Sequence, residues 1–350
     1  MSQPFGEPDF LPTAALPVLR LRSEMLNWVR QFFRSKGFWE VETPLLSQDV
    51  CVDAWLEPFF VESGGSRFYL QTSPEFGMKR LLAAGAESIF QITRAFRQEE
   101  TGRLHNPEFT MLEWYRVGDT YHQQMDFVEK LTHGFCHHAE VLARKIDGME
   151  AVDFKPAFLN GVQTSKAFCR TTYDDAFQQV FGDGVLSKSV ADLRALATKH
   201  GVEGPSSLVE DDRDGWLNLL LSEVVEPMLA KRETVFLYDY PASQAALSRI
   251  RSSDPPVAER FELYFHGVEI CNGYQELTDS HELRRRQTEQ SRKRQQAGLS
   301  QLPEHSRLLA AMDLGIPESS GVALGFDRLL LAALRMSSLS EVTAFPIGRA

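Results

Sequence analysis

Two stretches of the sequence alternate apolar and polar residues on either side of a polar turn, and each predicts an antiparallel hairpin. The first covers 87–117 and the second covers 258–272. Largely helical sequence lies between them, at 120–145 and 174–230. A glycine-rich strand followed by a helix occupies 321–334. Because hairpins are interleaved with helices, we expect an α+β fold with an antiparallel sheet flanked by helices, and not a parallel βαβ arrangement.

The N-terminal region predicts a lead-in, a helix and a strand. Residues 1–17 are rich in proline and are interpreted as a flexible lead-in. Apolar residues at helical spacing predict a helix over Leu19–Lys36, which Gly37 ends. The segment 38–44 alternates like a strand and stops at a proline. No domain linker is evident further on, so residues 18–350 are interpreted as a single domain.

The composition excludes several classes of protein. The 350 residues carry a net charge of −11, so no global basic field attracts nucleic acid, and tRNA is not an expected partner. The four cysteines form no C-x-x-C pair, which favours reduced thiols in the cytoplasm. Neither a signal peptide nor an apolar run of membrane-spanning length is present, so we expect a cytoplasmic protein without a membrane partner.

The first hairpin carries a dense set of polar and aromatic residues. Alternation places Arg97 and Glu99 on one side of its first strand, and Phe109, Glu113 and Tyr115 on one side of the returning strand. These residues offer a guanidinium group for a phosphate, an aromatic face for a base and carboxylates for an amine. The alternative interpretation is a solvated hairpin whose wet face carries ion pairs.

The second hairpin brings two carboxylates together. If His266-Gly267 forms a two-residue turn, residue 264 lies opposite 269 and residue 262 lies opposite 271. Glu262 and Glu269 then share a face as diagonal neighbours, an arrangement that suits Mg²⁺ bound to phosphates. Exposed glutamates without a metal are the alternative. Strict alternation places Asn272 on the apolar face, so it joins the polar face only if the chain bends there.

The glycine-rich strand near the C-terminus is a weaker signal. Gly321 and Gly325 precede a helix that begins near Asp327-Arg328. Glycines allow a ligand to approach the backbone closely, and an arginine at this position can bind a phosphate. Such glycines also occur where a strand and a helix simply pack tightly.

Taken in chain order, these motifs resemble those of class II aminoacyl-tRNA synthetases, and most closely those of the lysyl branch. The helix and strand ending at Pro44 resemble motif 1, which builds a homodimer interface in the family. Arg97-x-Glu99 with the segment 105–110 resembles motif 2, and the segment 325–328 resembles motif 3. The segments 72–75 and 269–276 resemble the lysine pocket. The resemblance therefore implies the class II catalytic core, an adenylate-forming reaction and a homodimer.

The resemblance also implies roles for individual residues. Arg97 would bind the α-phosphate and Arg328 the terminal phosphates, which makes these two the catalytic residues. The expected ATP-binding residues are Arg97, Glu99, Asn106, Phe109, Glu269, Ile270, Gly325 and Arg328. The expected amino-acid-binding residues are Ser73, Pro74, Glu75, Glu113, Tyr115, Asn272, Glu276 and Ala323. Glu262 and Glu269 would be ligands of Mg²⁺.

Two features depart from the lysyl synthetases. Motif 1 is reached within about forty residues, which leaves no room for the anticodon-binding domain of those enzymes. Ala323 stands where the family usually has glycine. Both departures match shortened lysyl paralogues that attach (R)-β-lysine to elongation factor P, which implies these two molecules as partners. The alternatives are a short lysyl-tRNA synthetase that charges tRNA and a non-catalytic regulatory paralogue.

Overall fold

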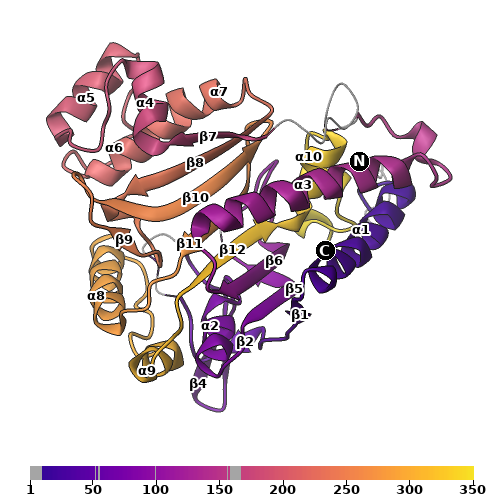
Figure 1. Ribbon diagram of the computed structural model, residues 1–350, viewed down its shortest axis with the longest axis horizontal. Coiled ribbons are helices and arrows are strands. Elements are labelled where there is room, and N and C mark those ends of the chain that lie inside the picture. The colour runs from indigo at the N-terminus through magenta and orange to yellow at the C-terminus, as the bar shows by residue number, and fades with distance from the viewer. Residues whose placement is uncertain (1–9, 52, 54–55, 99, 156, 158–166) are drawn as a thin grey trace, which may run out of the picture.

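The structure is a computed structural model that describes the whole chain except residues 1–9, 52, 54–55, 99, 156 and 158–166 (Figure 1). Its helices are α1 (Leu16–Ser35), α2 (Glu75–Ala83), α3 (Tyr121–Ala143), α4 (Tyr173–Phe181), α5 (Val190–Lys199), α6 (Arg213–Leu220), α7 (Glu226–Leu229), α8 (Ser280–Gln296), α9 (Arg307–Leu314) and α10 (Phe326–Leu334). Its strands are β1 (Trp39–Glu40), β2 (Leu46–Ser47), β3 (Phe60–Ser63), β4 (Ser66–Leu70), β5 (Ser88–Phe96), β6 (Glu108–Val117), β7 (Cys169–Thr172), β8 (Thr234–Pro241), β9 (Ile250–Arg251), β10 (Val257–Phe265), β11 (Val268–Gln275) and β12 (Ser319–Gly325).

The main sheet has the order β1-β5-β6-β12-β11-β10-β8-β7, with β9 paired to β10. All neighbours from β5 to β8 run antiparallel, while β1 and β7 join the two edges in parallel. A small separate sheet contains β2, β4 and β3. The predicted α+β class is therefore confirmed, with the addition that both edge pairs are parallel. Strand β12, far along the chain, inserts between the two predicted hairpins.

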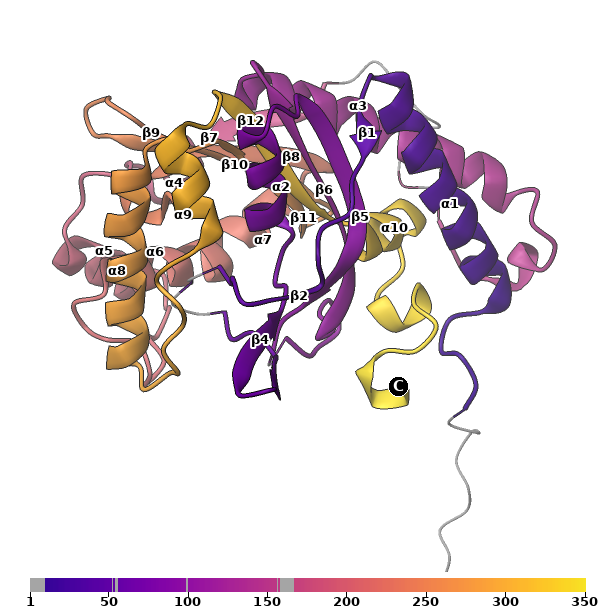
Figure 2. The ribbon, with the colours of Figure 1, turned by 90° about the horizontal axis from the view of Figure 1, so that it is seen from below.

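Helices α1, α3 and α10 cover one face of the sheet, as Figures 1 and 2 show. Their apolar sides pack on fully buried strand residues such as Phe90 and Trp114. Phe33 of α1 stacks on Phe90 with the two ring centroids 4.7 Å apart. Burial of this apolar surface supplies most of the driving force for the fold. No helix in the described ranges is both long and apolar enough to cross a membrane.

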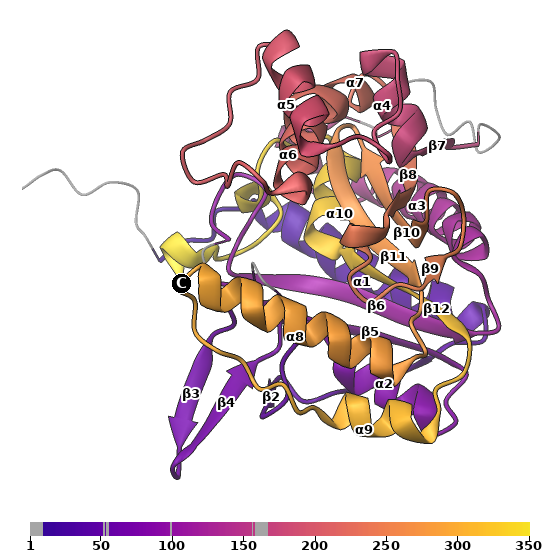
Figure 3. The same cartoon turned by 90° about the vertical axis from the view of Figure 1, so that its left-hand side faces the viewer.

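The opposite face carries two separate groups of helices (Figure 3). Helices α2, α8 and α9 pack through Leu82, Leu283 and Leu308 near β5 and β6. Helices α4 to α7 pack over β8 and β10. The middle strands β6, β12 and β11 are left to line a cavity between the two groups.

A buried ion pair joins α1 to the sheet and to α10. Arg22 of α1 lies 2.6 Å from the Asp327 carboxylate, and its guanidinium group also donates to the Thr110 hydroxyl at 2.7 Å. The Thr110 backbone N–H donates to Asp327 at 2.8 Å. The three segments that resemble motifs 1, 2 and 3 thus meet at one point.

The predicted N-terminal elements form with different bounds. Helix α1 begins at Leu16 and not at Leu19, because Pro17 fits the first turn of a helix, where its missing N–H leaves no carbonyl unpaired. Gly37 ends the helix with a φ of 82°, as expected. The predicted strand over 38–44 is limited to Trp39–Glu40, since only these residues pair with β5. Residues 1–9 of the predicted lead-in lie outside the described residues.

The β10–β11 hairpin contains a bulge that the sequence did not reveal. His266 and Gly267 form the predicted turn, with φ values of 48° and 75°, and Tyr264 pairs with Glu269 as expected. Beyond that pair Ile270 has no partner, so Glu262 lies opposite Asn272 and not opposite Cys271. The predicted register is therefore wrong by one residue there. The shift moves Asn272 to the face of Glu262 without a bend after it.

Candidate active site

A cavity of about 750 Å³ lies on the face of the sheet opposite α1 and α3. Its floor comes from β6, β11 and β12, and one wall comes from α8. Most of the predicted site residues line it: Ser73, Glu75, Arg97, Asn106, Phe109, Glu113, Tyr115, Glu269, Ile270, Asn272, Glu276, Ala323, Gly325 and Arg328. Pro74 and Glu262 are not among the lining residues, and Glu99 lies outside the described residues. The structure therefore brings the segments that resemble motif 2, motif 3 and the lysine pocket together around one cavity.

Sheet register explains why residues so far apart in sequence meet. Gln91, Glu113, Ala323, Asn272 and Glu262 are successive Cα partners on β5, β6, β12, β11 and β10. Directly paired residues in an antiparallel sheet point to the same side. This single row therefore crosses the cavity floor from the carboxylate of Glu113 to that of Glu262.

Strand β6 sets the long axis of the site. Phe109, Met111, Glu113 and Tyr115 alternate with buried core residues and all line the cavity, which confirms the predicted shared face. One end of this strand therefore presents an aromatic ring and the other a carboxylate and a phenol.

Two arginines, Arg97 and Arg328, line the end of the cavity that contains the Phe109 ring. The Arg97 guanidinium carbon lies 5.1 Å from the centroid of the Phe109 ring, and its Nη1 lies 3.3 Å from the Glu100 carboxylate. Asn106 accepts from the Ile347 N–H at 2.9 Å and donates to the Glu108 carbonyl at 2.6 Å. A cation stacked on an aromatic ring is a stable arrangement that a planar base can also join.

Arg328 is held by the loop between β5 and β6. It donates to the Leu104 carbonyl at 3.1 Å and the Glu269 carbonyl at 3.1 Å, and its Nη2 lies 2.7 Å from Nε2 of His105. Burial lowers the pKa of His105, and the positive charge of Arg328 lowers it further, so the ring is neutral and can accept this hydrogen bond. Gly325, at the start of α10, leaves space beside the Arg328 side chain.

Glu113 forms the centre of the opposite end. Its side chain is almost fully buried and accepts hydrogen bonds from Ser73 Oγ at 2.8 Å and Tyr115 Oη at 2.6 Å. Burial, together with the nearby charge of Glu75, raises the pKa of Glu113 to about 8. An ammonium group beside Glu113 would stabilise its ionised form.

A buried lysine that sequence reasoning missed lies behind two of the expected carboxylates. Lys79 Nζ is 2.5 Å from Glu75 and 2.5 Å from Glu276, and its side chain is only 3% exposed. Burial raises the pKa of Glu276 to about 7 against the opposing effect of Lys79. The i,i+4 spacing of Glu75 and Lys79 on a helix was the available signal.

Gly321 is required for this end of the cavity to close. A Cβ atom at this position would lie 2.3 Å from the Tyr115 ring and 2.6 Å from Glu276 Oε1. The sequence predicted that this glycine allows a ligand to approach, whereas the groups that approach it in the structure are side chains of the site.

Glu262 and Glu269 lie on one face of the hairpin, because Glu269 pairs with Tyr264, which is two residues from Glu262 on β10. Glu262 is bound by Arg260 at 2.5 Å and by the Tyr264 hydroxyl at 2.8 Å, and it faces a second cavity of about 470 Å³ that Glu269 also lines. Burial raises the pKa of Glu269 to about 7, and repulsion from Glu262 adds to the rise. In the described ranges, no group of three or more His, Cys, Asp or Glu side chains could hold a metal ion. Two carboxylates nevertheless suit Mg²⁺, which takes its remaining ligands from phosphates and water.

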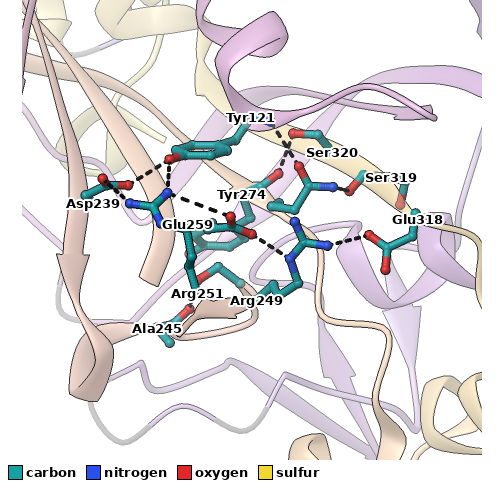
Figure 4. Close-up of polar contacts among 12 residues, drawn as sticks. Tyr121, Asp239, Ala245, Arg249, Arg251, Glu259, Tyr274, Glu318, Ser319 and Ser320 are labelled. Carbon is teal, nitrogen blue, oxygen red and sulfur yellow. Dashed lines mark hydrogen bonds and ion pairs between the residues drawn. The ribbon is translucent and has the colours of Figure 1, made fainter. Parts of the chain in front are cut away.

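A network of charged and polar side chains joins β8, β9 and β10 to the segment before β12 (Figure 4). Arg251 lies 2.5 Å from Asp239 and donates to the Tyr121 hydroxyl at 2.8 Å. Arg249 bridges Glu259 at 2.6 Å and Glu318 at 2.9 Å. These pairs connect β8, β9 and β10 to the start of β12, and they fix the frame in which Glu276 lies.

Comparisons with known proteins give matches over nearly the whole chain. The family model described as tRNA synthetases class II (D, K and N) matches residues 10–349. The chain is similar to a protein of Vibrio cholerae named elongation factor P–(R)-β-lysine ligase, with 42% identity over 98% of this chain and 99% of the relative. Proteins of the same name from Pectobacterium atrosepticum and Edwardsiella ictaluri are each 43% identical over 97% of this chain and 98% of the relative.

The raised pKa of Glu113 predicts that this residue costs stability at high pH. Between about pH 4.5 and about pH 8, Glu113 holds its proton in the folded protein but loses it in the unfolded chain. The free energy of unfolding therefore falls as pH rises through that window. The wild type loses this stability between pH 6 and pH 8.5, whereas Glu113→Gln does not. We therefore expect the free energy of unfolding of the variant, relative to that of the wild type, to rise by about 1–3 kcal/mol across this range. Chemical denaturation at several pH values measures this difference. The exposed Glu62→Gln variant is the control, and equal trends in both variants would contradict the interpretation.

Proposed function

The chain belongs to the class II tRNA synthetases of the aspartyl, lysyl and asparaginyl type, and from this premise we propose that it is a ligase for elongation factor P. It activates (R)-β-lysine with ATP and transfers the activated group to a lysine side chain of elongation factor P. Relatives that carry this activity in their names match almost the full length of the chain. The observation that carries the proposal is the polarity of the cavity, with Phe109 and two arginines at one end and buried carboxylates at the other.

In the first step the substrate carboxylate attacks the α-phosphorus of ATP. A new oxygen–phosphorus bond forms, the bond to the β-phosphate breaks, and pyrophosphate leaves with the electron pair. Phe109 stacks on adenine, and Arg97 stabilises the negative charge that develops on the α-phosphate. Arg328 binds the terminal phosphates. No covalent intermediate with the protein is required, because the residues act by positioning and by charge.

The buried carboxylates select a substrate with two ammonium groups. Glu75 binds the amine nearer the substrate carboxylate, while Glu113 and Glu276 bind the distant amine with Tyr115 and Asn272. Ser73 orients Glu113, and Pro74 is buried beneath the cavity wall, where it shapes the start of α2. In the second step a neutral lysine amine of elongation factor P attacks the activated carbonyl, an amide bond forms, and AMP leaves.

Mg²⁺ is part of the proposal. Glu262 and Glu269 would hold it beside Arg328, where it would neutralise charge on the phosphates.

A homodimer in the cytoplasm is also proposed. The exposed side chains of Leu16, Trp39, Leu45 and Leu46 support an interface near α1, and molar mass from light scattering tests it.

Two assays test the proposed reaction. ATP–pyrophosphate exchange with (R)-β-lysine reports the first step, and we expect Arg97→Ala to reduce it by about two orders of magnitude or more, as for loss of a preorganised donor. Arg67→Ala, on the exposed β3–β4 hairpin, is the matched control. A gel shift of elongation factor P reports the second step. Charging of tRNA in place of this shift would favour a short lysyl-tRNA synthetase, and absence of exchange in the wild type would favour a non-catalytic paralogue.

The metal proposal predicts a change in Mg²⁺ dependence. Glu262→Gln and Glu269→Gln each remove one negative ligand, so we expect a higher Mg²⁺ concentration for half-maximal exchange. Titration of Mg²⁺ at saturating ATP measures it, with Glu226→Gln in the second cavity as the control. Unchanged Mg²⁺ dependence in both variants would remove these residues from the metal site.

Ala323 predicts partial discrimination between α-lysine and β-lysine. Its methyl group lies between Glu113 and Asn272 in the row that crosses the cavity floor, where it limits the space for the substrate chain that joins the two amines. One methyl group changes selectivity by about 1–3 kcal/mol. We expect Ala323→Gly to improve use of α-lysine relative to β-lysine. The ratio of kcat/KM for the two substrates in the exchange assay decides, and an unchanged ratio would mean that Ala323 only packs.

A further inference from the structure

Lys79 is a buried ammonium group that the proposed chemistry does not use. It lies on α2, one turn after Glu75, and its Nζ is 2.5 Å from both Glu75 Oε1 and Glu276 Oε2. It is not among the residues that line the cavity, whereas both carboxylates are. The direct polar contacts of Lys79 with the substrate pocket are therefore those with these two side chains.

The geometry fixes the distance between the two carboxylates. Because each lies 2.5 Å from the same nitrogen atom, their nearest oxygens are at most about 5 Å apart. Two like charges so close in a buried site would keep one carboxyl group protonated if no cation lay between them. Burial opposes the charge on Lys79, but the two carboxylates outweigh it and its pKa is raised, so the ammonium form persists.

Groups on the surrounding elements complete the electrostatic setting. Strand β6 contributes Glu113 and the Tyr115 ring, whose centroid is 6.0 Å from Nζ, and β11 contributes Tyr274. Cys51 lies near Glu75 on the cavity wall, and Arg97 contributes a further positive charge nearby. Helix α9 packs against the other side of α2 through the apolar residues Leu308, Leu309 and Met312.

Counting charges suggests what Lys79 does. Glu75, Glu113 and Glu276 carry three negative charges when all are ionised, and Lys79 carries one positive charge. The net charge of the four side chains is then two negative units. The remaining two negative charges match two ammonium groups on the substrate. We propose that Lys79 is a positioning and specificity-determining residue, which bridges Glu75 and Glu276 and leaves the pocket matched in charge to a diamino acid. This inference rests on the proposed function.

The test compares Lys79→Met with the wild type in binding of (R)-β-lysine by calorimetry between pH 6.5 and pH 9. Without the ammonium group, repulsion from Glu75 favours a proton on Glu276, and the substrate must displace that proton. We expect at least about tenfold weaker binding at pH 7, the effect of one pKa unit, and recovery of most of the loss at pH 9. Arg80→Met, the next residue of α2 and partly exposed, is the matched control and should follow the wild-type pH profile.

ATP affinity of each variant, measured in the same way, reports whether the fold is intact. If Lys79→Met does not fold, the double variant Lys79→Met/Glu276→Gln replaces it, since it removes both charges together. The pH midpoint of β-lysine binding by the double variant should match the wild-type value. A midpoint displaced upward from the wild-type value would overturn the inference.

The possible failures are distinct. A wild-type protein that binds ATP but neither β-lysine nor α-lysine would contradict the proposed function itself. A Lys79→Met protein that binds β-lysine with the wild-type pH midpoint would contradict only the role of Lys79. Loss of β-lysine binding at every pH, with ATP binding intact, would also overturn the inference, because a packing role predicts no recovery.

Discussion

The arrangement of the molecule depends on a single buried ion pair, between Arg22 and Asp327. Asp327 also accepts from the backbone of Thr110, and Arg22 donates to the Thr110 side chain. Helix α1, strand β6 and helix α10 are thereby fixed relative to one another, although nearly the whole chain separates Arg22 from Asp327. The residue after Asp327 is Arg328, and the residue before Thr110 is Phe109. Breaking a buried pair leaves an uncompensated charge, so the positions of Phe109 and Arg328, for which we propose ligand contacts, depend on the contact between α1 and α10.

From that anchor the sheet distributes charge along one direction. Strand β6 carries the aromatic ring at one end and Glu113 toward the other, and the row from Gln91 to Glu262 crosses it. Arg97 and Arg328 lie near the ring of Phe109, where Glu100 and Glu269 are their partners, whereas Glu75, Glu113 and Glu276 gather at the far end. Such a distribution suits a reaction that joins an anionic nucleotide to a cationic amino acid, since the far end offers carboxylates to ammonium groups.

Much of this could be predicted from sequence, because strand alternation has a fixed period. The shared face of Phe109, Glu113 and Tyr115 follows from that period alone, as does the His266-Gly267 turn from its residue types. Three features could not be obtained in this way. Alternation does not reveal a bulge, so the partner of Glu262 was wrong by one residue. Glu75 and Lys79 have the i,i+4 spacing of an ordinary surface ion pair on a helix. Sequence alone does not reveal that Lys79 is buried and also contacts Glu276, which lies far along the chain. The bonds of Glu262 to Arg260 and Tyr264 depend on rotamers.

The bulge at Ile270 has a further consequence for how this hairpin tolerates change. On either side of it the same strand follows opposite phases of the inside–outside alternation, so Glu269 and Asn272 point to one side although they are three residues apart. A deletion of the bulge residue would restore a regular ladder and would leave Asn272 and Tyr274 on the face of Glu262, because their partners on β10 stay the same. The bulge can therefore be lost without moving the polar residues of this strand to the hydrophobic layer.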